Sequence, residues 1–132
     1  MREFQDRVLR GPPPLGPGAP AVERLEAFIE ALSRFTATHL DAVVVASAAP
    51  GHRRSPAFGF LLLHTRLLVR ELDPQLDDGI VAQLLLGALS APIVVDARTA
   101  RIDIDAVVAS ALALLRGLTG SHRDADAARD AT

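Results

Sequence analysis

Apolar residues recur along the chain at intervals of three and four positions, which is the period of an amphipathic α-helix. Five stretches carry this pattern, and almost no part of the chain alternates apolar and polar residues as a strand would. The predicted helices cover 1–10, 21–40, 57–72, 76–91 and 103–118, and a short apolar run at 42–49 follows a bend near Asp41. The sequence therefore predicts an all-α fold, a single helical-bundle domain of about five to six helices.

Breaker and capping residues separate these stretches. Residues 11–20 are rich in proline and glycine, which predicts an extended, exposed connector between two packing units. Pro92 disturbs the end of the fourth stretch, and a polar hinge is expected from Asp96 to Arg101. Gly117 and Gly120 are expected to end the last helix. The segment 119–132 has no large apolar residue, so it is predicted to be a disordered tail.

The side chains needed for catalysis or metal binding do not occur in recognisable spacings. No two of the four histidines stand four residues apart, and no glutamate precedes a histidine by three positions. The sequence has neither a glycine-rich phosphate loop nor a nucleophile elbow. The pairs Asp77–Asp78 and Asp103–Asp105 stand where helices begin, so they are interpreted as caps. We expect no enzyme activity, no catalytic residue, no metal and no cofactor.

One polar residue stands out, because His64 interrupts the most apolar stretch of the chain. A buried imidazole needs a partner, which is either a group on a neighbouring helix or a ligand in an apolar pocket. Phe28 and Phe35 lie seven residues apart on one helical stripe, and Phe58 and Phe60 begin the central helix. These rings either fill the core or line a cavity for a flat or aliphatic molecule.

Charge and composition restrict the partners. The 14 basic residues are all arginine and are balanced by 16 acidic residues, so the formal net charge is −2. Such a chain has no basic stripe to neutralise a phosphate backbone, and His52-Arg53-Arg54 is interpreted as a solvated loop with anion binding as the lesser alternative. The polar N-terminus and the lack of a long apolar run predict a cytoplasmic protein without a membrane span. The absence of lysine, asparagine, tyrosine and tryptophan is typical of a GC-rich bacterial genome.

The order of the elements adds a family resemblance. The stretches Leu63–Pro74, Leu84–Pro92 and Val107–Leu118, together with the short first helix and the connector, resemble the effector-binding part of tetracycline-repressor (TetR) family transcription regulators. The resemblance covers roughly residues 1–118. It implies that the last two helices, about 76–91 and 103–118, pair with their copies in a dimeric four-helix bundle.

The resemblance also implies particular residues. The dimer interface would contain Leu84, Gly87, Ala88, Ala91, Val108, Ala111, Leu112 and Leu115. The pocket for an inducer would be lined by Phe28, Leu32, Phe35, Phe58, Leu62 and His64.

Regulators of this family carry an N-terminal helix-turn-helix of about 50 residues, and this chain begins where that unit has ended. DNA contact is therefore expected only through an N-terminal domain that is absent from this chain. The resemblance implies a homodimeric ligand-sensing domain that binds a small apolar effector and controls DNA binding by that missing head. The alternative is a stand-alone helical interaction protein that does not bind DNA.

Overall fold

The computed structural model describes the backbone of all 132 residues and the side chains of all but Thr119 and 121–126. The described backbone contains seven α-helices, one 3₁₀ helix and no strand. The elements are α1 (Arg2–Arg10), α2 (Ala21–Thr38), α3 (Leu40–Ala48), η1 (His52–Arg54), α4 (Pro56–Leu72), α5 (Asp78–Ala88), α6 (Ala91–Thr99) and α7 (Ile104–Asp130). The prediction of an all-α single domain is confirmed, with seven helices instead of five to six.

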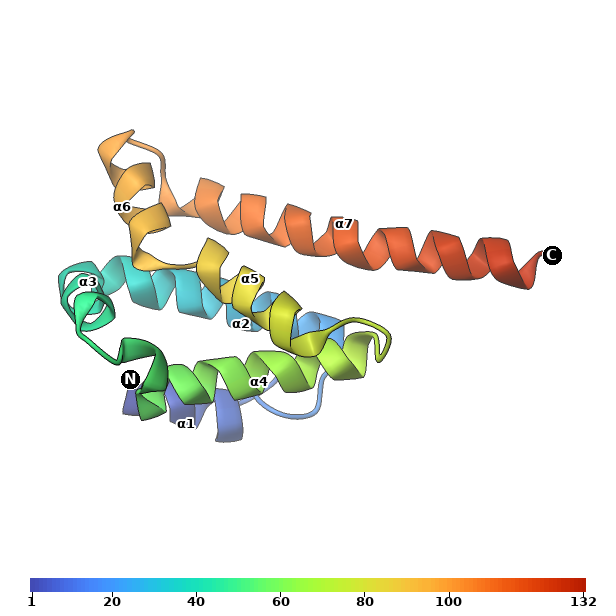
Figure 1. Ribbon diagram of the computed structural model, residues 1–132, viewed down its shortest axis with the longest axis horizontal. Helices are drawn as coiled ribbons and strands as arrows, with labels where there is room; N and C mark the ends of the chain where they lie inside the picture. Colours follow the sequence, from blue (N-terminus) through green and yellow to red (C-terminus); the bar gives the residue numbers. More distant parts are fainter.

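The helices surround α2, which packs against α4 and α7 (Figure 1). α5 lies on α4, and α3 and α6 contact each other at the end of the bundle where α2 finishes. The core contains the most completely buried large side chains of the described residues, which are Leu25, Phe28, Ile29, Leu68 and Leu115. A smaller cluster of Leu40, Ala91 and Val94 joins α3 to α6. Burial of these apolar faces is the main force that holds the helices together.

The first helix belongs to the same core as the others. Phe4 and Val8 are buried, and the ring of Phe4 lies 6.0 Å from Phe28 and 5.4 Å from Phe35, centroid to centroid. The prediction that the connector separates two packing units is therefore wrong. An amphipathic helix of nine residues is too short to be stable alone, so its apolar stripe is held against α2.

The connector folds back on itself in turns and is not simply extended. The N–H of Gly16 donates to the carbonyl of Pro12 at 3.0 Å, and Gly16 is buried. A Cβ at this position would lie 1.8 Å from the carbonyl oxygen of Gly11, so the close approach of the two backbone segments requires glycine.

The fourth predicted helix is two helices. α5 ends at Ala88, and Ser90 precedes α6, which carries Pro92 in its first turn. Proline is tolerated in the first turn because no intrahelical hydrogen bond is lost there. α6 then continues to Thr99 through most of the expected hinge, and the chain turns at Arg101 with a φ of 59°.

The last helix is longer than predicted. Gly117 and Gly120 lie inside α7, and the segment expected as a disordered tail is helical as far as Asp130. Glycine inside a helix costs about 1 kcal/mol relative to alanine, and the alanine-rich sequence that follows favours the helix. α7 extends well past the rest of the bundle (Figure 1).

Arginines of α4 fix the start of α5. Arg66 Nε donates to Asp78 Oδ2 at 2.8 Å, and Arg70 lies 3.3 Å from the same oxygen. The hydrogen bond from Arg66, with the charge of Arg70 adding to it, lowers the pKa of Asp78 below its usual value. Both arginines thus join α4 to α5 within the chain.

We predict that Asp77→Ala destabilises the protein by about 1 kcal/mol, because Asp77 is the N-cap of α5 and its Oδ1 accepts from the N–H of Ile80 at 3.0 Å. Urea unfolding followed by far-UV circular dichroism measures the change. Asp6→Ala, at an exposed position inside α1, is the control. An equal loss in both variants would contradict the capping role.

The stretch Asp78–Thr99 is long and apolar enough to cross a membrane by length and composition alone, so the expectation that no run reaches this length is wrong. Only 22% of its apolar window is buried. Core helices of soluble proteins can have the same length and composition. The stretch is divided into α5 and α6, which run in different directions (Figure 1).

Candidate functional site

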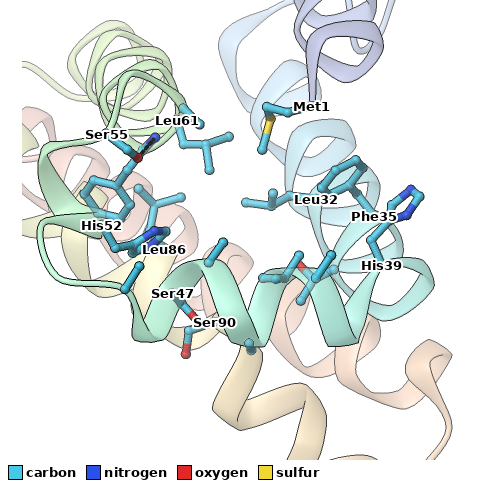
Figure 2. Close-up of a pocket in the computed structure, with 18 of the residues that line it drawn as sticks. Met1, Leu32, Phe35, His39, Ser47, His52, Ser55, Leu61, Leu86 and Ser90 are labelled. Carbon is cyan, nitrogen blue, oxygen red and sulfur yellow. Dashed lines mark hydrogen bonds between the residues drawn. The ribbon is translucent and has the colours of Figure 1, made fainter.

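The main cavity has a volume of about 690 Å³ and lies between α2, α3 and α4 (Figure 2). Met1 closes one side of it, and Leu86, Leu89, Ser90 and Ala91 of the α5–α6 region contribute another. Its apolar wall includes Leu32, Phe35, Val43, Phe58 and Leu61, and its polar groups are Thr36, His39, Ser47, His52, Ser55 and Ser90. No arginine, aspartate or glutamate occurs among the described residues that line it. The volume is in the range of sites for small organic molecules.

The cavity exists because α3 is poor in large side chains on the face that it turns toward α2 and α4. Ala42 and Ala46 of α3 are among the lining residues. The bulkier Leu32 and Leu61 point into the space from α2 and α4 (Figure 2). Small side chains cannot reach the opposite wall, so the volume stays open. The break at His39 lets α3 turn away from the axis of α2, since α2 ends at Thr38.

Three of the six residues predicted to bind a ligand line this cavity, namely Leu32, Phe35 and Phe58. Phe28, Leu62 and His64 are absent from its described lining. Phe28 is 1% exposed and fills the core between α2 and α4. Leu61 lines the cavity where Leu62 was expected, which corresponds to a phase error of one residue, about 100° of helix rotation.

His64 is a core residue in this structure. Its side chain is 7% exposed, and the ring lies 4.9 Å from Phe28 and stacks at 6.0 Å on Phe60. Burial, together with the charge of Arg24, lowers the pKa of His64 to about 4, so the imidazole is neutral at pH 7. Its Nε2 has no hydrogen-bond partner among the described residues. His64 is thus packed in the core, and its Nε2 does not make the hydrogen bond that was expected from a neighbouring helix among the described residues.

A second cavity of about 540 Å³ adjoins the first. The two share Ser47, His52, Phe58, Leu86, Ser90 and Ala91 as wall residues. The second cavity adds charged and polar groups, of which Arg53, Gln83 and Asp96 are the most polar. The boundary between the cavities therefore also separates a wall without arginine or acidic side chains from a wall that contains them.

Phe58 organises this boundary. The guanidinium carbon of Arg53 lies 5.1 Å from the centre of the Phe58 ring, and the ring of His52 meets Phe58 edge-on at 5.5 Å. Arg53 Nη2 also donates to Gln83 Oε1 at 2.7 Å, which joins η1 to α5. The basic loop that was expected to be solvated is thus partly held in place by a ring that faces the main cavity.

The predicted dimer-interface residues fall into three classes of exposure. Leu84, Gly87 and Ala88 are exposed, and Ala111 and Leu112 are half-buried. Ala91, Val108 and Leu115 are buried within this chain. The break between α5 and α6 turns Ala91 toward α3, and the face of α7 that carries Val108 and Leu115 packs inward. Ile80, Leu114 and Leu118 are exposed apolar residues on α5 and α7.

No group of three metal-ligating side chains occurs among the described residues. His122 lies outside the described side chains. Comparison of the chain with protein-family models, with curated proteins and with solved structures found no match. The family resemblance therefore remains a prediction based on the sequence.

Proposed function

We propose that this chain is the ligand-sensing and dimerisation domain of a bacterial transcription regulator of the TetR kind, and that it acts by binding rather than by turnover. The observation that carries the proposal is the cavity of about 690 Å³ between α2, α3 and α4, whose wall is mainly apolar. A small apolar effector fits such a space, since apolar walls with a few polar groups are typical of ligand sites. A cytoplasmic location belongs to the same proposal.

Two contacts support transmission of an effect from the cavity to α1. Met1 lies in the cavity wall, and Phe35, another wall residue, contacts Phe4 of α1 at 5.4 Å. An effector that displaces Phe35 therefore changes the surface on which α1 packs. Such a ligand shifts the position of α1 only if it binds one arrangement of α1 and α2 better than another. The direct contact between Phe35 and Phe4 links ligand binding to that arrangement.

DNA contact is assigned to a head that is not among these 132 residues, because their formal net charge of −2 does not favour a phosphate backbone. In the proposal α1 joins that head to the sensing core. The reading frame upstream of the Met1 codon tests this part. A helix-turn-helix sequence in frame would support it, and a stop codon close to Met1 would contradict it.

The ligand-binding part is tested with an environment-sensitive apolar dye and the variant Ala46→Trp. Ala46 lines the cavity from α3, so an indole there occupies the space that a ligand needs. We expect dye affinity to fall about tenfold or more, which corresponds to about 1.4 kcal/mol.

Val45→Trp is the matched control, because Val45 is the neighbouring residue of α3, is 73% exposed and lines neither of the two cavities. It should bind the dye as the unchanged protein does. Equal affinity in all three proteins would place the dye elsewhere and contradict the proposed site.

The dimerisation part rests on the uncovered apolar residues of α5 and α7, with Leu84 68% exposed and Leu114 66% exposed. A second copy of the chain is the proposed partner, since a two-fold axis brings the same apolar surface of each copy together. α6 is tied to the bundle by Arg98, whose Nη2 donates to the carbonyl of Ala37 at 3.1 Å. This bond, and the charges of Asp96 and Arg98 within 78–99, favour a protein interface over a membrane span.

The exposed apolar surface also supports the second candidate, a stand-alone interaction protein. Leu63 and Leu67 of α4 are 58% and 51% exposed, at a spacing of four that suits a helical partner. Light scattering on the purified chain separates the two candidates, because a homodimer needs no other protein and the interaction protein would be a monomer on its own.

A further inference from the structure

The two adjoining cavities differ in charge, and this difference bears on the class of effector. The first is lined by no arginine, aspartate or glutamate among the described residues, whereas the second contains Arg53 and Asp96. A charged group in the first cavity would find no arginine, aspartate or glutamate side chain as a partner, and an unpaired charge removed from water is costly. A ligand that carries charge must therefore place that charge at the junction with the second cavity.

Building on the proposed function, we infer that the effector is an anionic amphiphile, whose apolar chain or ring system fills the first cavity and whose carboxylate or similar anionic group binds Arg53. The shared wall of Ser47, His52, Phe58 and Ser90 is the passage between the two ends of such a molecule. The combined site binds the apolar part by burial and the anionic part by a charge-assisted hydrogen bond.

Arg53 has donors available for an anion. Its Nη2 is bonded to Gln83 Oε1, a neutral acceptor, and none of the described carboxylates forms an ion pair with it. A guanidinium has five N–H donors in a planar fork, which matches the two oxygens of a carboxylate. The Phe58 ring, 5.1 Å from the guanidinium carbon, holds this fork beside the shared wall.

The other charged and polar groups at the junction define the competing possibility. His52 adds a second nitrogen-bearing ring beside Phe58, and Ser90 precedes α6 without a side-chain capping bond. Asp96 is the one carboxylate in the described wall of the second cavity, and it does not line the first. A cationic amphiphile would need Asp96 as its partner, whereas Arg53 is fixed on a residue that both cavities share. The geometry favours the anion.

Three ligands of equal chain length test the inference at pH 8, where a carboxylic acid is ionised. Decanoate, decanol and decyltrimethylammonium are compared by displacement of an apolar dye, at concentrations below those at which they form micelles. We expect decanoate to bind about tenfold or more tightly than decanol, because a hydrogen bond to a charged group contributes about 1.5–3 kcal/mol.

Arg53→Gln should remove the preference for decanoate and leave decanol affinity within about twofold. Arg54→Gln is the matched control, since Arg54 is the exposed neighbour and lines neither of the two cavities. Far-UV circular dichroism verifies that each variant is folded.

The outcomes separate the inference from the proposal on which it rests. If decanol or decyltrimethylammonium binds at least as well as decanoate, or if Arg53→Gln keeps the preference, the anionic class is overturned and the ligand site stands. If none of the three displaces the dye and Ala46→Trp has no effect, the ligand site itself is overturned.

Discussion

Acidification from pH 7 to pH 4 is expected to lower the free energy of unfolding by about 3 kcal/mol through His64 alone. The pKa of this side chain is lowered to about 4 in the folded protein, from an ordinary value of 6.5. Between these two values the unfolded chain binds a proton that the folded chain does not. Stability is therefore complete above pH 6.5 and falls as the pH decreases toward 4.

The cause of this pH dependence is the packing around His64. The ring lies between Phe28 and Phe60, at 4.9 and 6.0 Å, with the positive charge of Arg24 acting on it. Protonation would place a cation in this apolar contact without a hydrogen-bond partner for Nε2, which is the costly state. A loss of about 3 kcal/mol is large compared with the 5–15 kcal/mol that stabilise most domains.

Urea unfolding at pH 7, 6, 5 and 4 measures the effect in the unchanged protein and in His64→Leu. Leucine keeps an apolar side chain in the site and cannot be protonated, so the variant should lose about 3 kcal/mol less over this range. The pKa of Asp78 is also lowered, so the stability that this carboxylate contributes is lost below about pH 4. Its effect therefore falls outside the range between pH 6.5 and 4 in which His64 acts. Parallel stability curves for the two proteins would show that His64 is not the group responsible.

Much of the fold could be predicted from local sequence signals. Helical periodicity identified α1, α2 and α4, and the bend predicted near Asp41 lies two residues after the break at His39. The end of α6 was not predicted, because the residue with positive φ after it is Arg101 and glycine is the usual signal there. There the N–H of Ile102 donates to the carbonyl of Ala97 at 2.8 Å, a backbone bond that composition does not reveal.

The candidate site was only partly predictable for a different reason. Leu32, Phe35 and Phe58 lie on helices whose apolar faces the sequence shows. His52 and Ser90 come from a short turn and a helix junction, and they join the site through tertiary packing alone. The phase of α4 decided between Leu61 and Leu62, and every position from Phe60 to Leu63 is apolar, so periodicity gave no preference there.

Ala88→Arg is expected to weaken the proposed homodimer by about a hundredfold or more, because like charges brought together at an interface cost several kcal/mol. Ala88 is exposed at the end of α5, one turn after Leu84, which is 68% exposed. A two-fold axis through this surface duplicates each substitution, so two arginines enter one interface. Light scattering coupled to size-exclusion chromatography measures the mass at tens of micromolar.

The control has to add the same charge without touching the proposed surface. Ala100→Arg does so, because Ala100 is exposed at the end of α6 and lines none of the described cavities. It should remain a dimer.

If the unchanged protein is a monomer, the dimer proposal is contradicted. Flotation of that monomer with lipid vesicles would then assign 78–99 to a membrane surface. If Ala88→Arg stays dimeric, the two copies meet through another surface. The exposed Leu63 and Leu67 of α4 are then the next residues to substitute, because exposed apolar residues mark interaction sites.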